Sequence, residues 1–271
     1  MDLFTDKLLI ISFFLMTVTV IETLAYATRI SGARVRLIST AVSLFSTMVI
    51  FSRMSVMFQQ PLMGKLIVEA PNRDPLSFLQ DQYRILIAVT TLGVLVGIIM
   101  FPTFISIFSR GIIELSEEKG SVLAVVRKWA NLRGGRKVLA YIRLPRFADL
   151  RGITLQTIPK RLFVLNIVIS AVYTTGVMSA LYASLIVPED YRQAAVLSSG
   201  IINGIATILL TLFIDPKVSV LADRVAKKES SYIYLKSYSV TMIGSKLAGT
   251  VAAQLVFLPA ALYVAWFVMW I

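Results

Sequence analysis

The chain has 271 residues, of which 57% are hydrophobic and 15% charged, and its mean hydropathy is +0.78. Ordinary soluble domains carry about 25% charged residues, so this composition excludes a soluble globular protein and a disordered one. The chain contains no Cys and no His, which excludes disulfides, thiol catalysis and the usual zinc, copper and haem sites.

Apolar segments long enough to cross a bilayer recur along the whole chain. A spanning helix needs about 20 apolar residues, and six segments meet this length: 8–27, 37–57, 85–108, 162–187, 194–214 and 247–271. The first is not a cleaved signal peptide, because Asp2 and Asp6 stand where a basic region is required. We therefore expect an all-α, polytopic membrane protein with six transmembrane helices, forming one membrane domain over residues 1–271.

The basic residues predict the orientation of these helices. The connections 28–36, 109–161 and 215–246 carry 21 of the 27 Lys and Arg residues, and all three fall on one side of a six-helix protein. Cytoplasmic loops carry the excess of Lys and Arg, so we expect both termini to lie outside the cell. The net charge of +12 is then mostly a topology signal, and nucleic-acid binding is not needed to explain it.

The longest polar stretch is 109–161. Apolar residues recur there at helical spacing from Ile112 through Val122 to Trp129, with basic residues between them. This pattern predicts one amphipathic helix on the inner leaflet, with Trp129 at headgroup depth. The stretch is either a basic loop that fixes topology or a surface that collects anionic lipid headgroups.

Weak internal similarity suggests two three-helix units, at 1–108 and 162–271. Offsets of 155 and 157 relate two pairs of prolines, Pro61 with Pro216 and Pro102 with Pro259. The first pair is expected to close the second helix of each unit, and the second pair to lie inside the third helix. Three is odd, so the units would be inverted, as in many secondary transporters. Pro102 and Pro259 are then candidate gating positions; the alternative is six unrelated helices.

Two charged residues fall inside the apolar segments. Glu22 lies late in the first span and Arg53 late in the second, and such charges usually face a partner or a wet cavity. A rise of about 1.5 Å per residue places them about 15 Å apart along the membrane normal, too far to pair. This favours an aqueous cavity or a bound anion at Arg53. The alternatives are Arg53 extending to the outer headgroups and Glu22 pairing with Arg29 or Arg36.

Further polar residues are candidates for binding and coupling. Arg29, Arg34 and Arg36 are expected to cluster at the inner mouth, where guanidinium groups suit a lipid pyrophosphate, although positive-inside bias also explains them. Single amides in spans more often bond neighbouring helices than substrate. The amides to consider are Asn166, Asn203 and Gln254 within spans and Gln59 and Gln60 at a helix end. Of these, Gln59 and Asn203 are the candidates for substrate binding.

A charged segment follows the fifth span. Asp215, Lys217 and Asp223 alternate in sign there. They form either an ion-paired interfacial helix or a coupling site for protons or cations. Motifs for chemistry do not appear: the chain has no glycine-rich nucleotide loop and no histidine-based catalytic set, so we expect neither an enzyme nor a cofactor.

Three blocks of sequence resemble the Amj family, the alternate lipid II flippases of bacteria. These blocks are 21–34, 43–64 and 213–223, and the similarity in length and span pattern covers nearly the whole chain. Positions that match them are Glu22, Arg29, Arg34, Arg53, Gln59, Asp215 and Asp223.

The resemblance implies a multi-pass transporter of the bacterial cytoplasmic membrane. It would move the undecaprenyl-pyrophosphate-linked peptidoglycan precursor, lipid II, from the inner to the outer leaflet by alternating access, with Arg binding the pyrophosphate. We also expect contact with anionic inner-leaflet lipids, and a homodimer would suit so large a headgroup. The alternatives are a small-solute or ion transporter and a membrane scaffold without transport.

Overall fold

The computed structural model describes residues 6–71, 73–129, 142–143, 145, 152–153 and 159–271. These residues form helices and connections, with no strand among them. The prediction of six helices long and apolar enough to cross a membrane is confirmed within these ranges. They are α1 (Asp6–Val35), α2 (Ile38–Val68), α3 (Pro75–Glu117), α6 (Lys160–Ile186), the continuous helical run of α7 and α8, and α9 (Tyr232–Trp270).

The helices extend well beyond the apolar segments. α3 has 43 residues and α9 has 39. Asp74 caps α3 by accepting a hydrogen bond from the Ser77 backbone N–H at 3.1 Å, and Ser231 caps α9 in the same way through Ile233 at 3.2 Å. Capping side chains satisfy the unpaired N–H groups at a helix start, so polar residues before the apolar segments become part of each helix.

The expected proline ends of the second and fifth spans are wrong. Pro61 lies inside α2, which continues to Val68. The fifth span begins after a short turn, η3 (Glu189–Tyr191), and runs through α7 (Arg192–Leu209), a π-helical turn η4 (Leu210–Ile214) and α8 (Asp215–Ala226). Pro216 stands in the first turn of α8, directly after the π-helical turn, so it does not end the helical run.

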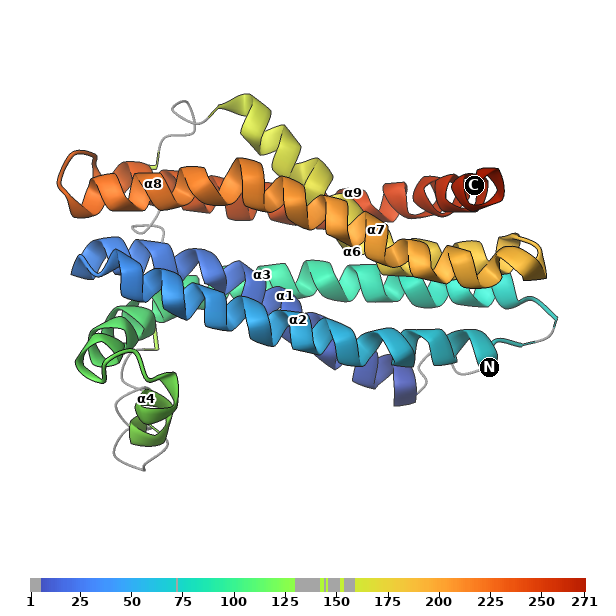
Figure 1. The fold of residues 1–271 in the computed structure, drawn as a ribbon, viewed down its shortest axis with the longest axis horizontal. Helices are drawn as coiled ribbons and strands as arrows, with labels where there is room; N and C mark the ends of the chain where they lie inside the picture. Colours follow the sequence, from blue (N-terminus) through green and yellow to red (C-terminus); the bar gives the residue numbers. More distant parts are fainter. Residues whose placement is uncertain (1–5, 72, 130–141, 144, 146–151, 154–158) are drawn as a thin grey trace.

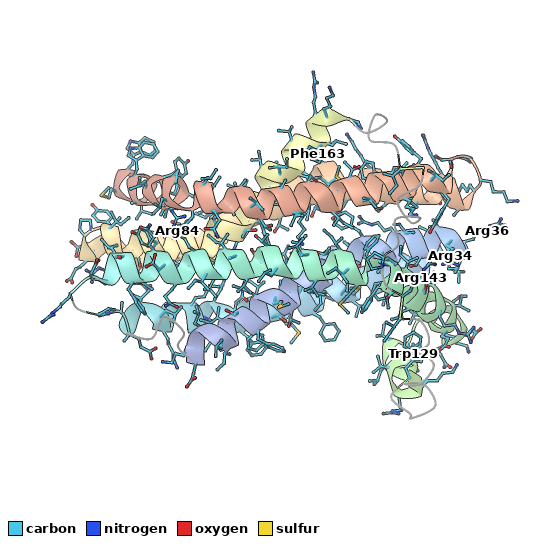
Figure 2. The ribbon with its side chains drawn as sticks, turned by 180° about the vertical axis from the view of Figure 1, so that it is seen from behind. Arg34, Arg36, Arg84, Trp129, Arg143 and Phe163 are labelled. Carbon is cyan, nitrogen blue, oxygen red and sulfur yellow. The ribbon has the colours of Figure 1, made fainter. Side chains whose placement is uncertain are left out.

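The helices associate in two groups, which Figure 1 shows in its blue-to-cyan and yellow-to-red parts. α1 packs on α2 and α3, and α6 packs on α7 and α9, while α3 and α9 make contact between the groups. The start of α1 and the end of α9 lie at the same end of the bundle (Figure 1). We call this the terminal end. The opposite end carries Arg34, Arg36 and Trp129 (Figure 2) and is called the basic end.

Close helix packing within each group depends on glycine. A Cβ on Gly97 of α3 would lie 2.7 Å from the Cβ of Thr23 on α1. A Cβ on Gly249 of α9 would lie 2.7 Å from the backbone oxygen of Ile167 on α6. Small residues let membrane helices approach closely and gain van der Waals contact, so these glycines set the spacing in each group.

The amphipathic helix expected at 112–129 is broken in two. α3 ends at Glu117, a turn with left-handed backbone at Lys119 and Gly120 follows, and α4 runs over Val122–Trp129. The Trp129 indole N–H donates to Glu114 on α3, so α4 folds back onto the basic end instead of continuing α3. The glycine permits this reversal, because left-handed backbone disfavours residues with a Cβ. Residues 130–141 of the basic stretch lie outside the described part of the chain.

We predict that Gly249→Ala destabilises the bundle by about 1–3 kcal/mol, because the added methyl group meets α6 backbone that cannot move aside. Gly244→Ala on the same helix is the matched control, since its Cβ would meet no atom within 4 Å. Thermal unfolding of the detergent-purified variants measures both. Equal melting temperatures would show that α6 and α9 have room to spare.

Candidate functional site

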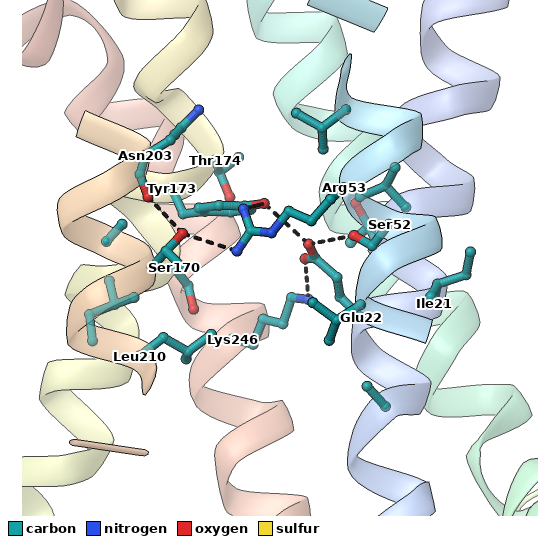
Figure 3. A pocket seen from close by; sticks show the side chains of 18 of the residues that line it. Ile21, Glu22, Ser52, Arg53, Ser170, Tyr173, Thr174, Asn203, Leu210 and Lys246 are labelled. Atoms are coloured by element: carbon teal, nitrogen blue, oxygen red, sulfur yellow. Dashed lines mark hydrogen bonds and ion pairs between the residues drawn. The ribbon is translucent and has the colours of Figure 1, made fainter. Parts of the chain in front are cut away.

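A cavity of about 550 Å³ lies between the two helix groups. Its walls come from α1 and α2 on one side and from α6, α7, η4 and α9 on the other, as Figure 3 shows. Five charged side chains of the described part of the chain line it: Glu22, Arg29, Arg53, Asp215 and Lys246. A polar cavity within an apolar bundle is where intramembrane charges are tolerated, so this cavity is the candidate functional site.

Arg53 reaches across the cavity from the middle of α2 (Figure 3). Its Nη1 donates to the Tyr173 hydroxyl at 3.1 Å, and its Nη2 donates to the Thr207 hydroxyl at 3.0 Å. The guanidinium carbon lies 5.5 Å from the centre of the Tyr173 ring, within cation–π range. Arg53 therefore faces the cavity and does not extend to the headgroups. Its hydrogen-bond partners are neutral.

Glu22 accepts hydrogen bonds from three helices. The Lys246 ammonium lies 3.0 Å from Oε2, the Ser52 hydroxyl 3.0 Å from Oε1, and the Tyr173 hydroxyl 3.4 Å from Oε1. The alternative pairing of Glu22 with Arg29 or Arg36 is thus wrong, because the carboxylate binds Lys246.

The expected separation of Glu22 and Arg53 is also wrong. Tyr173 contacts both side chains, accepting from Arg53 and donating to Glu22. The apolar segments 8–27 and 37–57 place both residues late in their predicted spans. Because α1 and α2 extend to Val35 and Val68, both residues fall near the middle of their helices, at similar depth.

Lys246 was not anticipated as a site residue. The sequence predicts a cytoplasmic connection up to Lys246, because the apolar segment begins at Leu247, whereas α9 begins at Tyr232. One signal was present: Lys246 is the only charged residue after Lys236. Tyr173 and Thr207 were also missed, since hydroxyl groups in apolar spans are common and carry no distinguishing pattern.

A second ion pair lies nearer the basic end. Both Nη atoms of Arg29 lie 3.1 Å from Oδ1 of Asp215, and the guanidinium carbon lies 4.2 Å from the centre of the Phe45 ring. Arg29 is 4% exposed. Two residues predicted for different roles, binding and coupling, therefore neutralise each other between α1 and α8.

The expected arginine cluster does not form. Arg29 is buried in the bundle, whereas Arg34 and Arg36 are exposed at the basic end (Figure 2). Five residues separate Arg29 from Arg34, which places them on different faces of a 3.6-residue helix. Arg36 follows the end of α1 with left-handed backbone at φ 59°, so it leaves the helical register.

The remaining candidates divide between the cavity and the surface. Gln59 and Asn203 line the cavity, and the side-chain oxygen of each is buried without a hydrogen-bond partner among the described residues. Lys217 is exposed, and Asp223 pairs with Lys227 at 2.8 Å on the outside of α8. The prolines expected to gate lie within α3 and α9, outside the cavity lining: Pro102 and Pro259.

Two comparisons with known proteins, one with a family model and one with a curated protein, point to the same family. The model of the Amj family, described as "Alternate to MurJ", matches residues 14–268. The lipid II flippase Amj of Bacillus subtilis (strain 168) is 52% identical over 270 residues, which cover 100% of both chains. No solved structure matches the chain.

We predict that the buried Arg29–Asp215 pair has a coupling energy above about 1 kcal/mol. A double-mutant cycle with Arg29→Gln and Asp215→Asn, read by thermal unfolding, measures it. The exposed Arg192–Glu189 pair, also 3.1 Å apart, is the control, and its coupling should stay below about 0.5 kcal/mol. Equal coupling in the two cycles would contradict a structural role for the buried pair.

Proposed function

The chain belongs to the Amj family, and on that basis we propose that its cavity carries the pyrophosphate of lipid II across the membrane. The protein is a lipid II flippase of the bacterial membrane, a transporter and not an enzyme. In the proposed mechanism, Arg53 binds the pyrophosphate, and the two helix groups expose the cavity to each side of the membrane in turn.

The observation that carries the proposal is that Arg53 has no carboxylate partner in the cavity among the described residues. Its guanidinium lies in the cavity and donates to two neutral hydroxyl groups, while the nearest carboxylate binds Lys246. A charge kept inside a membrane at such cost usually serves a pathway or a ligand. Guanidinium groups bind phosphate oxygens through two parallel hydrogen bonds, so an anionic linkage can replace the two hydroxyls.

The wall on either side of the cavity suits the rest of the substrate. α2 and α7 are the least buried of the spanning helices, and exposed apolar side chains cover them, including Ile50, Phe51, Leu197 and Ile201. A polyprenyl tail can stay against these surfaces in the lipid while the polar head occupies the cavity. The side-chain oxygens of Gln59 and Asn203 have no hydrogen-bond partner among the described residues, so they can accept hydrogen bonds from sugar or peptide groups.

Alternating access is supported by the position of the cavity between α1–α3 and α6–α9. Toward the basic end the Arg29–Asp215 pair joins the groups. Toward the terminal end the cavity meets an apolar cluster that contains Leu15, Met63 and Met178. Opening either barrier exposes the same site, which is how inverted three-helix units operate. An inside-negative potential favours outward movement of anions by about 2.3 kcal/mol per charge per 100 mV.

The basic end is suited to the anionic inner leaflet. Leu123 and Val126 of α4 are exposed, and Arg127 and Lys128 stand in the last turn of the same helix. An apolar face combined with basic residues is typical of a helix that lies in the headgroup region. This surface would hold the basic end at the membrane from which lipid II is taken.

We predict that Arg53→Ala lowers lipid II flipping at least about tenfold, because the pyrophosphate loses its charged donor. Rescue of a flippase-deficient bacterium and labelling of outer-leaflet lipid II provide the measurement. Arg192→Ala, a surface arginine, is the matched control, and membrane abundance of each variant checks folding. Full rescue by Arg53→Ala would remove Arg53 from the mechanism.

The orientation with both termini outside is also testable. The chain has no cysteine, so single cysteines can be introduced at two exposed glutamates, Glu189 and Glu229. The Lys and Arg distribution predicts that a membrane-impermeant maleimide labels Glu189→Cys in intact cells and labels Glu229→Cys only after permeabilisation. The reverse pattern would invert the topology.

A further inference from the structure

The charges that line the cavity do not balance. Arg29 and Asp215 neutralise each other, and Glu22 neutralises Lys246. Arg53 therefore leaves the cavity with one excess positive charge. A pyrophosphate that joins a lipid to a sugar carries two negative charges, so binding it to this cavity unchanged would leave one excess negative charge in a medium where unpaired charge is costly.

Lys246 can serve as a second cation if its ion pair with Glu22 breaks. Lys246 Nζ bonds Glu22 at 3.0 Å, and the two side chains are 14% and 24% exposed, so the pair reaches the cavity surface. Neutralising the Glu22 carboxylate would release the Lys246 ammonium toward the cavity, where the Arg53 guanidinium also lies (Figure 3). Two cations then face one doubly charged anion, and the loaded cavity has no net charge.

Tyr173 connects the anion site to Glu22. Its hydroxyl accepts from Arg53 at 3.1 Å and donates to Glu22 at 3.4 Å. A phosphate oxygen that accepts the hydrogen bond from Arg53 replaces the Tyr173 hydroxyl as its acceptor. Because the same hydroxyl donates to Glu22, this replacement also alters the hydrogen bonding of the Glu22 carboxylate. The geometry thus places the phosphate site and the proton site within one hydrogen-bond chain.

We propose that Lys246 is a second phosphate-binding residue, masked by Glu22, and that Glu22 takes up one proton when the diphosphate linkage binds between Arg53 and Lys246. This inference rests on the proposed function. The step is balanced: one proton from the compartment facing the cavity joins the Glu22 carboxylate, the Glu22–Lys246 ion pair breaks, and the ammonium and the guanidinium donate to the phosphate oxygens. No covalent bond of the substrate changes.

Glu22 is well placed to take up this proton, because few other ionisable groups of the described residues face it. They are Tyr26 and Arg29 on α1, Arg53 on α2, Tyr173 on α6, Asp215 on α8 and Lys246 on α9. The segment 85–109 of α3 and the segment 193–214 of α7 and η4 contain no ionisable residue. Asp215 is held by Arg29, so Glu22 is the carboxylate whose partner can pass to the substrate.

The test is binding of a short-chain lipid II analogue to the full chain in detergent. In a weakly buffered solution with an indicator dye, we expect uptake of about one proton per analogue bound, and a Kd that rises about tenfold per pH unit where Glu22 is ionised before the analogue binds. The wild-type protein alone gives this result, so it does not depend on any variant that fails to fold.

Variants assign the proton and the second cation. Glu22→Gln should bind with a Kd independent of pH and without proton uptake, whereas Glu189→Gln, the same change at an exposed surface position, should behave as wild type. Both proteins meet the same substrate, so titration of the substrate itself cancels. Adding Lys246→Gln to Glu22→Gln should weaken binding at least about tenfold, because Lys246 then acts on the ligand and no longer on Glu22.

The outcomes separate this inference from the proposed function. Wild-type protein that binds the analogue in an Arg53-dependent manner, with no proton uptake and a Kd independent of pH, overturns the role of Glu22 and leaves the flippase mechanism standing. Equal affinity of Glu22→Gln with and without Lys246→Gln overturns the role of Lys246. Failure of wild-type protein to bind the analogue at all overturns both proposals.

Discussion

The ion pair between Glu22 and Lys246 is the interaction on which the cavity depends. Isolated charges at this depth are costly, and here each one compensates the other across the two helix groups, at 3.0 Å. The pair joins α1 to α9, as Arg29–Asp215 joins α1 to α8. Because these contacts are polar, the space around them stays lined by hydrogen-bonding groups instead of closing into an apolar core.

Arg53 has a different status from the other four charges. Its bonds to Tyr173 and Thr207 tie α2 to α6 and α7, yet these hydroxyls do not neutralise it. α2 and α7 are also the spanning helices with the least burial. Moving them would expose little apolar surface that is now buried, and regions with few buried apolar contacts are those that open most easily. A ligand at Arg53 thus acts on the helices whose movement exposes the least buried apolar surface.

The sequence allowed the number of spanning helices and their approximate places to be predicted, because apolar runs of this length have one stable solution in a bilayer. The predicted ends of the helices are wrong, because capping residues such as Asp74 and Ser231 start a helix within polar sequence, ahead of the apolar segment. For this reason the sequence places Lys246 in a connection, whereas it lies inside α9. The wrong ends also set Glu22 and Arg53 at different depths, although Tyr173 binds both.

By itself, the sequence determined a six-span, cysteine-free membrane protein, predicted its orientation from the Lys and Arg residues, and singled out Glu22 and Arg53 as costly charges. These properties follow from composition and hydropathy, which act locally along the chain. Only the tertiary structure decided the partners: Lys246 for Glu22, Asp215 for Arg29, and two hydroxyls for Arg53. Those pairs join residues up to 224 positions apart, and helix packing, not spacing in the sequence, brings them together.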